Sequence, residues 1–288
     1  MRPGSTSLQR TYRYLRIAIV GAVVVVFTAI ATTLPVVGIL PSISHYYYSP
    51  ANTLFVGALI AVSVSLFALS GRGAERVLLD AAATIAPLVA IVPTAVSPGS
   101  IAGADAACPG DRRTCVPEEY AAAVDSGVMT YLIVGAAVVI LAAALTVAGE
   151  VDRRGAAVSI VISLPVLLVV GLTWGFARTA FLAWAHVASA SLFFLLIAAV
   201  AVRTAIAPRA PGAPPWLRRA YIAIAVAIAV LVAGMPLYGA LHAGRVYGVF
   251  VGEVLALVLF AGFWILQSVQ YWHADDPAII GPRAPQSG

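Results

Sequence analysis

Long apolar stretches alternate with short polar connectors along almost the whole chain. Most of these stretches approach the roughly 20 residues that an α-helix needs to cross the hydrocarbon core of a bilayer. The pattern therefore predicts an all-α fold, a polytopic transmembrane helix bundle of about eight spans that occupies residues 17–271. The predicted spans are residues 17–40, 54–69, 77–96, 128–148, 156–176, 181–202, 221–241 and 246–269.

The two ends of the chain and one inner connector are polar. Residues 1–16 precede an apolar run of about 24 residues, which exceeds the roughly 7–15 residues of a signal-peptide core, so we expect a retained first helix. Residues 203–219 carry several prolines and read as a stiff, extended linker. Residues 272–288 are polar and are expected to form a disordered tail.

Composition and charge agree with a membrane protein. Hydrophobic residues make up 61% of the chain, charged residues only 10%, and the mean hydropathy is +0.98. A soluble protein has about 25% charged residues, so the surplus apolar surface must face lipid. The net charge of +5 would suggest a nucleic-acid partner in a soluble protein, but here the arginines lie at span ends. We expect membrane lipids as partners and no nucleic acid.

The arginine distribution predicts how the chain threads through the membrane. With the N-terminus inside, thirteen arginines fall on inner segments, and an even number of spans places both termini in the cytoplasm. All the cationic side chains are arginine, which, with the abundance of alanine and valine, is typical of a GC-rich bacterial genome. We therefore expect the cytoplasmic (inner) membrane of a bacterium. The outer segments carry only Arg112, Arg113, Arg178 and Arg245.

The longest outer loop, residues 97–127, contains the only two cysteines, Cys108 and Cys115. Disulfides persist in oxidising compartments, and the Pro-Gly pair between the cysteines favours the turn that a bridge requires. We predict a disulfide that pins the loop. Two idle thiols are the alternative, and a metal site is weaker because two ligands do not complete one.

Three ionisable residues lie inside apolar spans, namely Asp80, His186 and Glu253, and such residues mark functional sites by default. Helical rise places Glu253 and His186 roughly 8–11 Å below the outer boundary, level with the polar segment SISHYYYSP at residues 42–50. We hypothesise one outward-facing ligand or proton site. Its members are His45, Tyr46, Tyr47, Tyr48, His186 and Glu253, with Arg178, His242 and Arg245 at the rim.

Each of these residues also has a plainer interpretation. His45 and the tyrosines suit an interfacial aromatic belt, and His186 suits a hydrogen bond between helices. Asp80 belongs to the inner side and is one turn from Arg76, with which a structural ion pair would form. Glu253 adjoins a stripe of small residues that indicates close helix packing: Gly244, Gly248, Gly252 and Ala256.

Three classes of function follow. The first is non-enzymatic binding or transport of a small molecule or lipid through the outward-facing polar pocket. The first alternative is a metal-dependent intramembrane hydrolase, because His45, His186 and Glu253 form an acceptable zinc ligand set. The second alternative is a structural membrane scaffold. No cofactor is expected, because the chain has no Gly-rich phosphate loop, HExxH, CxxC or G-x-S-x-G motif.

The stretch SISHYYYSPANTLFVGALIAVSVSLFALSGRG at residues 42–73, followed by VAIVPT, resembles an uncharacterised family of bacterial multi-pass membrane proteins. The resemblance extends to HVASASLFF at residues 186–194 and to Glu253, and it implies membership and a polar site without an activity. Intramembrane hydrolases related to alkaline ceramidases and adiponectin receptors combine Ser-x-x-x-His, an aspartate and a late His-x-x-x-His. This chain departs from that pattern, because His186 is followed four residues later by Ala190 and His242 by Val246.

Overall fold

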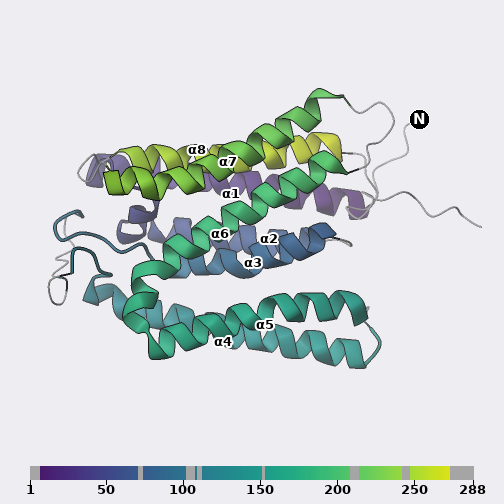
Figure 1. Cartoon of the computed structure of the whole chain (residues 1–288), viewed down its shortest axis with the longest axis horizontal. Coiled ribbons are helices and arrows are strands. Elements are labelled where there is room, and N and C mark those ends of the chain that lie inside the picture. Colours follow the sequence, from purple (N-terminus) through teal and green to yellow (C-terminus); the bar gives the residue numbers. More distant parts are fainter. Residues whose placement is uncertain are drawn as a thin grey trace, which may run out of the picture.

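The computed structural model describes residues 7–70, 74–101, 108, 112–150, 153–207, 214–241 and 247–272. The fold is all-helical, at 85% helix, and the described residues contain no strand (Figure 1). Apart from the short 3₁₀ helix η1, the elements are α-helices that match the predicted apolar runs in order. They are α1 (Ser7–Val37), η1 (Ile43–Tyr48), α2 (Asn52–Leu69), α3 (Ala74–Ile91), α4 (Glu118–Val147), α5 (Arg153–Phe176), α6 (Arg178–Ile206), α7 (Trp216–Leu241) and α8 (Gly248–Gln270).

Seven of the described helices are long and apolar enough to cross a membrane, as in a multi-pass membrane protein. Helix α3 corresponds to the predicted third span but is not one of the seven, because its 18 residues include Glu75, Arg76 and Asp80. The number of spans, about eight, and the side on which the termini lie stay predictions.

Several helices extend beyond the predicted spans because polar residues at their ends find partners. Helix α1 begins ten residues early, at Ser7, and takes up most of the predicted N-terminal segment. The Arg13 guanidinium donates to the carbonyl of Trp272 and lies 4.8 Å from its ring, while Arg16 lies 5.5 Å from the ring of Tyr271. Cation–π contacts of this kind stabilise arginine at a helix end. The middle of the predicted linker, residues 208–213, and the tail from residue 273 lie outside the described residues.

Six of the described helices form a closed ring, in which each helix packs against the next. The order around the ring is α1, α2, α3, α6, α7 and α8, and α8 packs back against α1. Helices α4 and α5 form a hairpin outside the ring that packs on α3, and Figure 1 shows it as a separate layer beside α3 and α6. Because so little of the hairpin is covered by protein, its apolar side chains would face lipid.

Aromatic side chains fill the half of the ring that lies away from η1. Phe260 and Phe263 of α8 are buried, as are Phe193 of α6 and Tyr221 of α7. The Phe193 and Phe260 rings lie 5.6 Å apart, and those of Tyr221 and Phe263 5.7 Å, both within the range of favourable aromatic pairs. This packing closes the ring on the side where the chain begins, so any cavity must lie toward η1.

A proline inside α3 shows how the ring satisfies its backbone without water. Pro87 has no N–H, so the carbonyl of Ala83, four residues earlier, loses its helical partner. The buried hydroxyl of Ser63 in α2 donates to that carbonyl at 2.7 Å. A buried carbonyl without a partner would cost free energy, so this contact fixes α2 against α3.

Two contacts at Cys115 hold the predicted outer loop. The sulfurs of Cys108 and Cys115 lie at disulfide distance, 2.10 Å, as the spacing predicted. Cys115 also forms an isolated antiparallel bridge with Val96, through hydrogen bonds of 2.9 and 3.0 Å. The start of α4 is thereby tied to the end of α3, beside η1.

Candidate functional site

The candidate site is built around η1, which folds back over the end of the ring where α1 finishes (Figure 1). Gly38 makes this return possible, because its positive φ of 71° is strained for residues with a side chain. The Ser42 hydroxyl caps η1 by accepting from the backbone N–H of His45 at 3.3 Å. The Tyr46 hydroxyl donates to the Gly38 carbonyl at 3.0 Å and so ties η1 to the end of α1.

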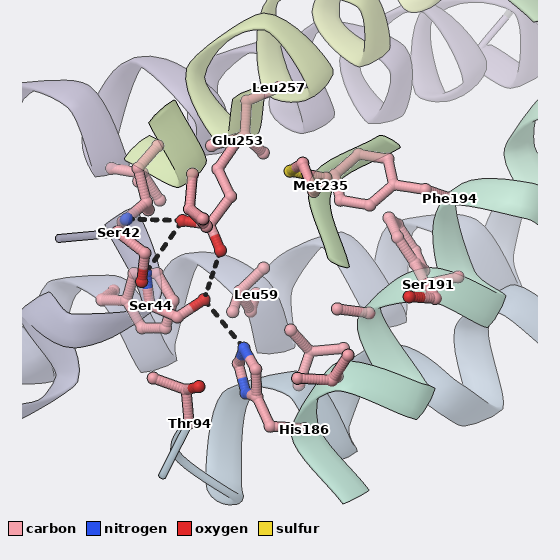
Figure 2. Close-up of a pocket in the computed structure, with 18 of the residues that line it drawn as sticks. Ser42, Ser44, Leu59, Thr94, His186, Ser191, Phe194, Met235, Glu253 and Leu257 are labelled. Atoms are coloured by element: carbon pink, nitrogen blue, oxygen red, sulfur yellow. Dashed lines mark hydrogen bonds between the residues drawn. The ribbon is translucent and has the colours of Figure 1, made fainter. Parts of the chain in front are cut away.

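Side chains from three elements meet in one hydrogen-bonded row (Figure 2). Ser44 of η1 lies in the middle, with its hydroxyl 2.8 Å from Nε2 of His186 on α6 and 3.1 Å from Oε1 of Glu253 on α8. The other ring nitrogen of His186, Nδ1, lies 2.7 Å from the carbonyl of Val92. The other carboxylate oxygen, Oε2, accepts from the backbone N–H groups of Ile43 and Ser44. We call Glu253, Ser44 and His186 the polar row.

The polar row forms one wall of a cavity inside the ring, with a volume of about 520 Å³. That volume falls within the roughly 300–1,000 Å³ typical of small-molecule sites. All six ring helices and η1 contribute to its lining, and most of the lining side chains are apolar. The cavity is therefore amphipathic: polar beside η1 and apolar toward the aromatic floor, where Val62, Phe193, Phe194, Leu257 and Phe260 line it.

The cavity reaches the outer surface of the ring beside α6. Two lining residues of α6, Trp184 and Val187, are 69% and 39% exposed, and the lining residue Pro236 of α7 is exposed as well. Helices α6 and α7 diverge toward this end of the bundle (Figure 1). The cavity is therefore nearest to the surroundings of the bundle between α6 and α7.

His45 lies beside the row and lines the same cavity. Its Nδ1 is 2.6 Å from the Ser42 hydroxyl. Burial, and to a smaller degree the nearby imidazole of His186, lowers the pKa of His45 to about 4. His45 is therefore neutral at pH 7 and adds a dipole, not a charge, to this end of the cavity.

The three tyrosines of the predicted site have a different place. Tyr46, Tyr47 and Tyr48 are buried, and none of them is among the described residues that line the cavity. The Tyr48 hydroxyl donates to the Thr94 carbonyl at 2.7 Å, and its ring packs edge-on against Tyr120 with centroids 4.8 Å apart. Burial raises the pKa of each of these tyrosines. They anchor η1, and they are neither a cavity wall nor an exposed aromatic belt.

The alternative zinc site does not assemble. Among the described residues, no group of three His, Cys, Asp or Glu side chains is placed to hold a metal ion. His45 bonds to Ser42, whereas both nitrogens of His186 and both oxygens of Glu253 engage backbone groups or Ser44. His45, His186 and Glu253 thus lie near one another, but their nitrogen and oxygen atoms form hydrogen bonds with other groups.

The predicted rim and the small-residue stripe are only partly described. Arg178 forms an ion pair of 2.7 Å with Asp125 of α4 and lies away from the cavity lining, while His242 and Arg245 lie outside the described residues. On α8, Gly252 is buried, and a Cβ there would come within 2.9 Å of Met235 on α7. The glycine thus lets α7 approach α8 beside Glu253, as the stripe predicted.

Asp80 belongs to a separate network toward the other end of α3. Its carboxylate is buried, 3.4 Å from the Arg76 guanidinium and 2.7 Å from the Ser159 hydroxyl of α5. Thr84, one turn further, contacts Ser163 of α5 at 3.3 Å. This network joins α3 to the hairpin and has the pairing with Arg76 that the sequence indicated.

Sequence reasoning missed Ser44, which is the centre of the polar row. Serine is common in membrane helices and loops, so neither its type nor its position distinguishes Ser44 from Ser42 or Ser49. The available signal was its place one residue before His45, in the polar, aromatic-dense segment that helical rise places level with His186 and Glu253. Val92, whose carbonyl orients His186, offers no side-chain signal at all.

Comparison with known proteins adds no identity. No protein-family model matches the chain, and no curated protein or solved structure matches it. The resemblance seen at residues 42–73 and 186–194 stays a prediction, and any functional conclusion must come from the geometry of the polar row and its cavity.

Proposed function

We propose that this integral membrane protein binds a small amphipathic molecule, such as a lipid-like compound with a single chain, inside the ring. The polar group of the ligand would contact the polar row, and its apolar chain would extend toward the aromatic floor. Binding would be non-enzymatic. The observation that carries this proposal is the amphipathic lining of the cavity, in which the row occupies one end and apolar side chains most of the rest.

Energetics favour a ligand of this kind. Each methylene group transferred from water into an apolar lining contributes about 0.8 kcal/mol. A molecule already dissolved in the bilayer gains little from its chain alone, because lipid is as apolar as the cavity. Specific binding therefore depends on the polar end, where the lone pair left on the Ser44 hydroxyl oxygen and the Thr94 hydroxyl offer hydrogen bonds that hydrocarbon lacks.

Decanol, a neutral single-chain amphiphile, provides the test. Titration calorimetry of the purified protein in nanodiscs, with the signal of empty nanodiscs subtracted, should show saturable binding at one site. Ala190→Phe places a ring in the cavity and should abolish that signal. Ala136→Phe, the matched change on the exposed face of α4, should leave it unchanged. Equal binding to the Ala190→Phe protein, or no saturable binding to the unchanged protein, contradicts the proposal.

We also infer that the cavity faces outward from the cytoplasmic membrane of a bacterium, with both termini inside. The support is that described arginines gather at the helix ends opposite η1: Arg10, Arg13, Arg76, Arg153, Arg154, Arg203, Arg218 and Arg219. After mild reduction of intact cells, a membrane-impermeant maleimide should label Cys108 and Cys115. Labelling that needs cell lysis would place this loop, and the cavity beside it, in the cytoplasm.

A further inference from the structure

The number of protons in the polar row can be worked out from which of its atoms can donate a hydrogen bond. A carbonyl oxygen only accepts, so the contact between Val92 and His186 requires a hydrogen on Nδ1. The Ser44 hydroxyl has one hydrogen and two partners, Nε2 of His186 and Oε1 of Glu253. If Ser44 donates to one partner, the other must donate to Ser44.

Two arrangements satisfy both contacts, and they contain the same number of protons. In one, Glu253 is a neutral acid that donates to Ser44, and Ser44 donates to neutral His186. In the other, imidazolium His186 donates to Ser44, and Ser44 donates to the Glu253 carboxylate. A shift of two protons along the row converts one into the other. In both, the row holds one proton more than a free carboxylate and a neutral imidazole would, and its net charge is zero.

Loss of that proton destabilises the polar row in two ways. The row acquires a negative charge, and one of the two atoms beside Ser44 loses its hydrogen bond. Among the described lining residues there is no arginine or lysine, and α1, α2, α3 and α7 contribute no ionisable side chain. The remaining titratable neighbour is His45 of η1, whose pKa of about 4 keeps it neutral at pH 7. A charge in such surroundings is costly unless a partner neutralises it.

An ammonium group offsets both effects at once. Its positive charge balances the row, and one of its three N–H donors fills the acceptor that the proton vacated. The Thr94 hydroxyl, which lies at the same end of the cavity, offers a second acceptor (Figure 2). A carboxylate ligand would instead face a cavity wall that has no arginine or lysine among its described residues to balance its charge. An alcohol ligand carries no charge, so its binding would not change the protonation of the polar row.

We propose that the cavity takes a primary or secondary amine with an apolar chain, bound as the cation in exchange for the one extra proton that the polar row holds. This inference rests on the proposed function and names its ligand class. The exchange is balanced, since one ammonium enters and one proton leaves to solvent, so the charge inside the ring does not change. Binding of the amine is therefore coupled to proton release.

Decylamine, decanol and decanoate share the same chain and so isolate the contribution of the polar group. Decylamine should bind the protein in nanodiscs at least about tenfold more tightly than decanol, and decanoate more weakly than either. Titrations at pH 7 in two buffers of different ionisation enthalpy measure protons exchanged. They should give one proton released per decylamine bound and none for decanol. This measurement uses the unchanged protein, so it does not depend on any variant folding.

Glu253→Gln provides the second arm, because the amide keeps hydrogen-bonding groups but cannot release the proton. The preference for decylamine over decanol, at least about tenfold in the unchanged protein, should be lost, and proton release should disappear. Decylamine binding without proton release overturns the inference while leaving the proposed function intact, and so does tighter binding of decanoate. Failure of all three compounds to bind, by contrast, contradicts the proposed function itself.

Discussion

The most direct test of the polar row as a structural element is Ser44→Ala. The serine is buried, and its hydroxyl is the only side-chain link among the described residues that joins η1 to both α6 and α8. Alanine preserves the backbone and most of the volume of the side chain. It leaves Nε2 of His186 and Oε1 of Glu253 without the partner that each had.

The size of the effect can be worked out from those two contacts. A buried polar group left without its partner costs about 1–3 kcal/mol. Both atoms line a cavity large enough for water, which lowers the cost, because ordered water can replace part of a lost hydrogen bond. We therefore expect Ser44→Ala to reduce the free energy of unfolding by about 2–4 kcal/mol. For a chain of this size, that loss lowers the melting temperature by roughly 5–10 °C.

Thermal unfolding in one fixed detergent, followed by circular dichroism, measures the difference. Ser63→Ala is a matched buried control that removes a single bond, to the carbonyl that Pro87 leaves free, and should cost about 1–2 kcal/mol. Ser126→Ala, at an exposed position of α4, should change stability by less than about 0.5 kcal/mol. If Ser44→Ala is no more destabilising than Ser126→Ala, the row does not hold η1 in the ring.

Three further predictions concern other parts of the chain. The folded pKa of His45 lies below its ordinary value of 6.5, so the unfolded chain binds a proton more readily than the folded chain does. The free energy of unfolding should therefore fall by roughly 1–3 kcal/mol between pH 6.5 and 4, and the melting temperature should fall with it. The His45→Asn protein should show a smaller fall in melting temperature over the same pH range. Reduction of the Cys108–Cys115 pair should lower stability by about 2 kcal/mol, a difference that should vanish in the Cys108→Ser, Cys115→Ser protein. Asp80→Ala leaves Arg76 without its carboxylate and should cost roughly 2 kcal/mol in the same melting assay, whereas an unchanged melting temperature would show the pair to be dispensable.

The helices could be predicted from the sequence because hydropathy reports directly on what surrounds a segment. Apolar runs as long as residues 128–148 and 156–176 predict lipid-facing helices, and they correspond to α4 and α5. The level of the candidate site was equally readable, since the rise of a helix places His186 and Glu253 at one depth. Helix α3 is the predicted span that is not among the seven membrane-capable helices, because Glu75, Arg76 and Asp80 lie in its first two turns.

The partners within the site could not be predicted, because they depend on which helices become neighbours. Nothing in the order of the helices indicates that α3 meets α6 and that α1 closes on α8, yet that ring creates the cavity. The tyrosines were assigned to the site for a related reason, because their neighbours could not be predicted. A run of three tyrosines suits a membrane interface or a site, and only the position of Tyr120 turns Tyr47 and Tyr48 into an anchor for η1.

A comparison of Asp80 with Glu253 favours η1 over α3 as the place for the proposed ligand. Asp80 has a guanidinium within 3.4 Å and a serine hydroxyl at 2.7 Å, so its charge is balanced by the protein itself. It is also absent from the described cavity lining. Glu253 has only uncharged donors among its described hydrogen-bond partners, namely two backbone N–H groups and the hydroxyls of Ser42 and Ser44, and it faces the cavity. A carboxylate whose charge the protein leaves unbalanced, beside a space of ligand size, must take its positive charge from a proton or from a ligand, and that requirement is why we propose the ligand site at Glu253.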